Sequence, residues 1–175
     1  MGAKETILEE IRRFPGQAGI YYHSLVSGET WGYRDTEPYL AASIVKLPLM
    51  AAILLWKSRG QTSFDDPVTI REDQKIPGCG AVQFLNGDVT LTVGELSKLM
   101  ITISDSCATN ALFRHYGAMA IHEAFLELGM IGTQFNREYW DAERENRGIN
   151  NYFVPREMGC LLQKMYDRTL VDEAS

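Results

Sequence analysis

One stretch constrains the fold more than any other: residues 43 to about 59, which read "SIVKLPLMAAILLWKSR". Apolar side chains would cover nearly the whole circumference of a helix built from these residues, so other elements must surround it. Pro48 falls in the first turns, where a missing N–H is tolerated, and Gly60 follows the last turn. The stretch therefore predicts a central buried helix that carries one serine and one lysine.

The remaining sequence predicts a single unit built mostly of helices. Its 175 residues are 45% hydrophobic, enough for one core, and they contain no repeat or low-complexity linker. Residues 18–35 read as two strands around a turn, a hairpin whose edges must be covered by helices or paired with further strands. Further amphipathic helices are predicted over 4–14, 92–103, 105–116, 118–128 and 155–168.

Charge and composition exclude several classes of function. The net charge is −6 and no like-charge cluster is long, which argues against a nucleic-acid or anionic-membrane partner. Neither the cysteines (Cys79, Cys107, Cys160) nor the histidines (His23, His115, His122) have metal-ligand spacing, so we expect no metal and no cofactor. No apolar signal core opens the chain, and the localisation is unknown.

The serine and lysine of the central stretch, Ser43 and Lys46, are three residues apart and lie on one face of a helix. A serine hydroxyl becomes a nucleophile when a base takes its proton, and burial lowers the pKa of a lysine so that it can be that base. The positive end of the helix would stabilise an oxyanion. The alternative is Ser43 as a helix cap, with Lys46 extending to solvent.

A second motif, Ser104-Asp105-Ser106, lies between two predicted helices. Ser104 can cap the second helix, and it can also place its hydroxyl beside Ser43 and Lys46 to relay a proton to a leaving group. Asp105 would brace the turn. The two interpretations are compatible.

With these motifs the chain resembles the class A serine β-lactamases and the related penicillin-binding proteins, whose motifs are Ser-x-x-Lys, Ser-Asp-Asn and Lys-Thr-Gly. The resemblance covers nearly the whole chain, with linked segments in the family's order. It implies that Ser43 is the acylated nucleophile, Lys46 its base partner and Ser104 the proton relay. It also implies that Asn110 supports the loop at the floor of the site.

The resemblance implies an α+β fold in which an all-α domain lies beside an antiparallel sheet with helices. Residues 1–40 would supply a helix and a β-hairpin of the α/β part, and residues 41–175 mostly the all-α part. No Lys-Thr-Gly occurs in the sequence, which ends "LVDEAS" without a turn signal. We therefore expect a truncated chain without the C-terminal strands, which a separate chain could supply, and the family suggests a periplasmic or secreted protein.

Two further departures from the family concern the site. Ser106 replaces the motif's asparagine, and with Cys79 in the glycine-rich "PGCGA" it is a candidate substrate contact, although a free cysteine is commonly a small buried hydrophobe. The family's Arg-x-Glu-x-x-x-Asn spacing places Tyr139 where the glutamate that orients the deacylating water belongs. Glu138, one position away, takes that role after a local shift or is a solvated surface charge.

The implied reaction is attack on a β-lactam carbonyl, formation of a covalent acyl-enzyme on Ser43, and hydrolysis by water. The substrate would be a β-lactam or a peptidoglycan-like small molecule. Three alternatives stay open: a sensor that remains acylated, a peptidase of peptidoglycan stems, and an inactive fragment.

Overall fold

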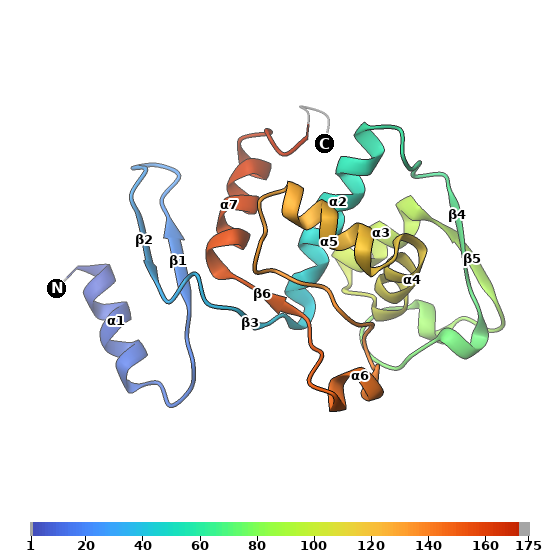
Figure 1. Cartoon of the computed structure of the whole chain (residues 1–175), viewed down its shortest axis with the longest axis horizontal. Coiled ribbons are helices and arrows are strands. Elements are labelled where there is room, and N and C mark those ends of the chain that lie inside the picture. The colour runs from blue at the N-terminus through green and yellow to red at the C-terminus, as the bar shows by residue number, and fades with distance from the viewer. Residues whose placement is uncertain (1, 172–175) are drawn as a thin grey trace.

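The computed structural model describes residues 2–171, and its regular secondary structure is mostly helical (Figure 1). The helices are α1 (Ala3–Arg13), α2 (Lys46–Ser58), α3 (Val93–Thr102), α4 (Ser106–Tyr116), α5 (Ala118–Glu127), α6 (Ala142–Asn146) and α7 (Pro155–Tyr166). The strands are β1 (Ile20–His23), β2 (Thr30–Tyr33), β3 (Tyr39–Leu40), β4 (Pro67–Ile70), β5 (Val89–Thr92) and β6 (Tyr152–Phe153). Short 3₁₀ turns are η1 (Ala42–Val45), η2 (Glu72–Gln74) and η3 (Val82–Phe84).

Helix α2 is the central helix that its apolar sequence predicts. It packs against α3 and α5, and Leu49, Ala52 and Ile53 are completely buried along it. The α-helix begins at Lys46 rather than at Ser43, because the preceding residues form the 3₁₀ turn η1. Pro48 therefore lies in the first turn, where its missing N–H leaves no hydrogen bond unmade.

Helices α3 and α4 follow one another with a sharp turn between them and pack together. A capping box starts α3: the Thr92 hydroxyl accepts a hydrogen bond from Glu95 N at 3.1 Å, and the Glu95 carboxylate accepts one from Thr92 N at 2.8 Å. Asp105 caps α4 by accepting a hydrogen bond from Ala108 N at 2.9 Å. The turn between the two caps carries Ser104.

The strands form three separate two-stranded antiparallel sheets, β1–β2, β3–β6 and β4–β5. Sheet β1–β2 is the predicted hairpin, and α1 lies beside it at one end of the molecule (Figure 1). Helix α7 packs on β1, where Gly159 leaves room for the Tyr21 ring and the Arg156 guanidinium lies 5.4 Å from the centre of that ring. A helix thus covers part of the hairpin.

The other two sheets position the segments around the site. Sheet β3–β6 pairs Tyr39 with Phe153 and Leu40 with Tyr152, and Ala41 N donates a hydrogen bond to Asn151 O at 2.9 Å. These contacts fix the chain immediately before η1 to the end of the loop 136–151. None of the helices within residues 2–171 is long and apolar enough to cross a membrane.

Candidate active site

Ser43 and Lys46 lie at the start of the central helix and differ sharply in exposure. Ser43, in η1, is exposed, whereas Lys46, the first residue of α2, is 3% exposed. A separation of three residues aligns side chains in a 3₁₀ turn, and the Lys46 Nζ lies 3.1 Å from the Ser43 Oγ. A buried amine therefore contacts an accessible hydroxyl.

Ser104 completes a triangle with these two residues. Its Oγ donates to the Ser43 Oγ at 2.9 Å and lies 2.8 Å from the Lys46 Nζ, which also contacts the Ser104 carbonyl oxygen at 2.8 Å. Ser104 has φ +57°, a left-handed conformation that is strained for a residue with a side chain. The structure thus brings together the three residues predicted as nucleophile, base and relay.

Burial lowers the pKa of Lys46, and the charges of Cys79 and Asp105 oppose this shift without reversing it. A neutral amine is therefore favoured relative to a lysine in water. A neutral amine can donate to both oxygens of Ser104 and accept the proton of Ser43 along the 3.1 Å contact. The arrangement suits proton transfer from Ser43 to Lys46.

Asp105 holds the glycine-rich loop against the start of α4. The Asp105 side chain is completely buried, and its Oδ2 accepts hydrogen bonds from Ala81 N at 2.7 Å and Val82 N at 2.9 Å. Gly80 has φ +106° and leaves no room for a Cβ, which would lie 2.2 Å from Asp105. Only glycine allows this loop to approach the carboxylate so closely.

The two predicted substrate contacts, Ser106 and Cys79, have different settings. Ser106 is 7% exposed, and its hydroxyl faces Gly78, where a Cβ would lie 3.1 Å away. Cys79 is exposed, and its carbonyl oxygen accepts a hydrogen bond from Ser106 N at 2.9 Å. The exposed Cys79 thiol is therefore more open to a ligand than the Ser106 hydroxyl, and substrate contact by either residue stays a prediction.

Asn110 on α4 fixes the backbone of Tyr139. Its Oδ1 accepts a hydrogen bond from Tyr139 N at 2.8 Å, and its Nδ2 donates to Tyr139 O at 3.0 Å. The Tyr139 hydroxyl donates to Ala42 O at 2.7 Å, and the centre of its ring lies 4.7 Å from the Lys46 Nζ. The side chain of Tyr139 therefore lies within the site, beside the amine.

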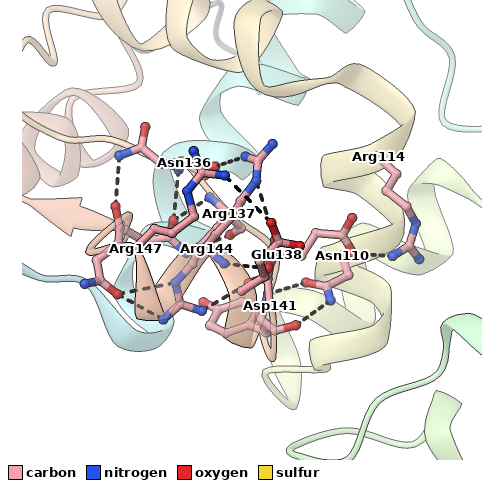
Figure 2. Close-up of polar contacts among 12 residues, drawn as sticks. Asn110, Arg114, Asn136, Arg137, Glu138, Asp141, Arg144 and Arg147 are labelled. Carbon is pink, nitrogen blue, oxygen red and sulfur yellow. Dashed lines mark hydrogen bonds and ion pairs between the residues drawn. The ribbon is translucent and has the colours of Figure 1, made fainter.

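Glu138 does not join this group. Its carboxylate is paired with Arg114 on α4, and both side chains are partly exposed. Figure 2 shows Arg114, Glu138 and Asn110 with these contacts. Asn110 binds the backbone of the next residue, Tyr139, and the Tyr139 side chain rather than that of Glu138 lies beside the Lys46 amine. A role of Glu138 in deacylation stays a prediction.

A polar network that the sequence did not reveal holds the loop 136–151 in place (Figure 2). The Asn151 Oδ1 accepts from the backbone N–H groups of Asn136 and Arg137 at 2.8 and 3.0 Å. The Arg137 guanidinium donates to the Asn150 Oδ1 at 3.1 Å and pairs with Glu145 at 3.1 Å. In the sequence, only the adjacent Asn150 and Asn151 after a charged stretch hinted at this network. Their hydrogen-bond partners come together only when the loop is folded.

Similarity to known proteins shows the family of the chain. Residues 2–175 match the family model described as the Beta-lactamase enzyme family. The protein belongs to this family. Its fold is accordingly β-lactamase/transpeptidase-like, mostly helical with small antiparallel sheets. Penicillin-binding relatives occur among the similar structures as well as β-lactamases.

Two curated family members illustrate the relationship. A beta-lactamase of Rhodobacter capsulatus is 28% identical over 134 residues, which cover 76% of this chain and 45% of that protein. The carbapenem-hydrolyzing beta-lactamase KPC of Klebsiella oxytoca is 30% identical over 132 residues, which cover 74% and 44%. The chain thus matches less than half the length of these relatives.

Among solved structures, PBP-A has a TM-score of 0.86 at 27% identity, covering 97% of this chain and 63% of that chain. A mutant of PBP-A, solved as an acyl-enzyme complex with penicillin G, has the same TM-score and coverage. The chain therefore also spans less than two thirds of these structures.

Proposed function

We propose that the protein is a penicillin-binding acyl-transfer protein in which a β-lactam acylates Ser43 and the acyl group leaves slowly. The triangle of Ser43, Lys46 and Ser104 carries this proposal, because it pairs an exposed hydroxyl with a buried amine whose pKa is lowered. Family membership and the penicillin complex of the PBP-A mutant support a β-lactam as the ligand.

Each member of the triangle has a role in acylation. The Lys46 amine takes the proton of the Ser43 hydroxyl while the Ser43 Oγ forms a bond to the lactam carbonyl carbon. As the lactam C–N bond breaks, the Ser104 hydroxyl gives its proton to the leaving nitrogen and receives one from Lys46. The positive end of α2 stabilises the oxyanion, and the amine ends neutral again.

Within the part of the chain that the structure describes, neither Tyr139 nor Glu138 is an evident base for the water of deacylation. Burial raises the pKa of the Tyr139 phenol, and Ser43 and Arg137 lower it only in part, so the side chain stays a neutral phenol near pH 7. A neutral phenol that donates to Ala42 O does not take a proton from water as a carboxylate does. Glu138 is engaged by Arg114. We therefore expect a long-lived acyl-enzyme.

Fast hydrolysis is the second candidate, and the names of the curated relatives favour it. Both relatives described above are named beta-lactamases, one of them carbapenem-hydrolyzing. In this alternative the Lys46 amine, restored after acylation, would activate water in place of a glutamate. The two candidates share acylation of Ser43 and differ in how long the adduct lasts.

Intact-mass spectrometry of the protein after addition of penicillin G tests both candidates. We expect one adduct with the mass of the whole antibiotic, persisting for many minutes after excess penicillin is removed. A transient adduct with released penicilloate would support hydrolysis instead. Absence of any adduct, or an adduct on Ser43→Ala, would refute Ser43 as the acylated residue. Ser27→Ala, in the exposed hairpin turn, is the matched control and should behave like the wild type.

A further inference from the structure

Tyr139 is held beside Lys46 at both its backbone and its side chain. Asn110 binds the Tyr139 N–H at 2.8 Å and its carbonyl oxygen at 3.0 Å, and the Tyr139 hydroxyl is bound to Ala42 O at 2.7 Å. Phe135 also lies against the ring, with centroids 6.2 Å apart. The aromatic ring is thus fixed at 4.7 Å from the Lys46 Nζ.

The surroundings of the Lys46 amine come from four parts of the fold. Ser43 of η1 and Ser104 of the α3–α4 turn contact it directly, and Asp105 and Cys79 act on it through their charges. Tyr139 of the loop 136–151 supplies an aromatic face. Each of the other groups is polar or charged, so Tyr139 is the apolar contributor among these neighbours of the amine.

We propose that Tyr139 is a positioning residue whose ring excludes water from the Lys46 amine and so keeps that amine able to take the proton of Ser43. This role rests on the proposed acylation of Ser43. This role of Tyr139 concerns acylation, the first step of the reaction, whereas a base that activates water concerns deacylation.

The ring has two opposing effects on Lys46. Exclusion of water disfavours the ammonium form and lowers the pKa, whereas the negative face of the ring favours the ammonium form and raises it. Burial is the leading cause of the lowered pKa of Lys46, and we assign part of that burial to the Tyr139 ring, which lies 4.7 Å from the amine. Removing the ring should therefore raise the pKa of Lys46 toward the ordinary value for lysine.

Three substitutions separate these effects. Tyr139→Phe keeps the ring and loses the hydroxyl, Tyr139→Leu keeps an apolar side chain without an aromatic face, and Tyr139→Ala opens the site to water. The hydrogen bonds between Asn110 and Tyr139 use the backbone of residue 139, so they remain available in all three variants. Tyr166→Ala, an exposed tyrosine on α7, is the matched control for the loss of a ring.

The measurement is the second-order rate constant for acylation by penicillin G as a function of pH. Acylation needs neutral Lys46, so the rate rises as pH rises through the pKa of this residue. In Tyr139→Ala the midpoint should move up by about one pH unit, and the rate well below the midpoint should fall about tenfold. Tyr139→Phe and Tyr166→Ala should keep the wild-type midpoint, and Tyr139→Leu should keep it or lower it slightly.

An unchanged or lowered midpoint in Tyr139→Ala would overturn the proposal. So would an upward shift of the same size in Tyr139→Phe and Tyr139→Leu, which would assign the effect to the hydroxyl. If the wild type forms no adduct, the proposed function fails on its own. An NMR titration of the Lys46 Cε in folded wild type and variants then tests the role of Tyr139, with the same shifts expected and the same outcomes contradicting it.

Discussion

The Lys46 amine contacts both the carbonyl oxygen and the hydroxyl of Ser104, each at 2.8 Å. One residue of the α3–α4 turn thus binds the amine through its backbone and its side chain. Ser104 holds φ +57° to do so, which is strained for a residue with a Cβ. The interaction therefore ties the position of the base to the conformation of this turn.

Two substitutions of Ser104 should therefore slow acylation alike but differ in stability. Ser104→Gly and Ser104→Ala both remove the relay hydroxyl, and each should slow acylation by about 10²-fold or more. Ser104→Gly also relieves the left-handed strain, so it should be about 1 kcal/mol more stable than Ser104→Ala in urea unfolding. Equal stabilities would show that the φ angle of this residue carries no strain.

Lys46→Arg tests whether the amine acts as a base. An arginine keeps a positive charge but does not lose its proton in proteins, so it is unable to accept the proton of Ser43. Acylation by penicillin G should fall by about 10²- to 10⁴-fold at pH 7. Stopped-flow or quenched mass measurements give the rate. Lys57→Arg, near the exposed end of α2, is the matched control, and an active Lys46→Arg protein would reject the base assignment.

The lowered pKa of Lys46 also predicts how stability depends on pH. Its pKa is lower in the folded protein than in the unfolded chain, so the unfolded chain binds more protons between the folded value and about 10.4. The free energy of unfolding should therefore rise with pH across that window. Lys46→Met should lose this contribution, and the difference between the two proteins in urea unfolding isolates it. A difference that is independent of pH would mean that the folded pKa is ordinary.

Asp105 should matter chiefly for stability of the site. Asp105→Ala leaves the N–H groups of Ala81, Val82 and Ala108 without their acceptor, and the bonds from Val82 and Ala108 are buried while that from Ala81 is partly buried. Losing a helix cap and these further bonds should cost about 3 kcal/mol in urea unfolding. Asp65→Ala removes an exposed carboxylate as a control and should change stability by less than about 0.5 kcal/mol.

Gly80 and Gly28 form a matched pair for the glycine-rich loop. Both have positive φ, +106° and +73°, but a Cβ at Gly80 would lie 2.2 Å from the Asp105 carboxylate, whereas nothing lies within 4 Å at Gly28. Gly28→Ala should cost about 1 kcal/mol from backbone strain alone. Gly80→Ala should cost more and should also slow acylation, because the loop must move away from Asp105. Equal effects on both properties would contradict this view of the loop.

Much of the helical structure was predictable because its signals are local. The apolar circumference of α2 and the breaks at Gly and Pro mark elements that appear within a few residues of their predicted ends. The sheets β3–β6 and β4–β5 were missed, since strands of two to four residues carry little alternation. Their pairing joins segments distant in the sequence, such as Tyr39 with Phe153.

For the candidate site, too, local motifs were predictable from the sequence, whereas contacts between distant segments were not. The spacing of Ser43 and Lys46 indicated their contact, and the family's motif order brought in Ser104 and Asn110. The pairing of Glu138 with Arg114 could not be predicted from sequence spacing, and the role of Glu138 in deacylation stays a prediction. The Tyr139 side chain rather than that of Glu138 enters the site because Asn110 binds the Tyr139 backbone, and this tertiary interaction is not visible in the sequence.

The hydrogen bonds between Asn110 and the backbone of Tyr139 determine which feature of the site a substitution at residue 139 can change. Asn110 holds the main chain of residue 139, and the side chain of Asn151 at the far end of the loop likewise binds backbone groups, those of Asn136 and Arg137. These contacts do not depend on the side chain of residue 139, so they remain available when that side chain is changed. Under the proposed mechanism, a substitution at residue 139 changes how long the acyl group stays on Ser43, while the backbone contacts of the loop are kept.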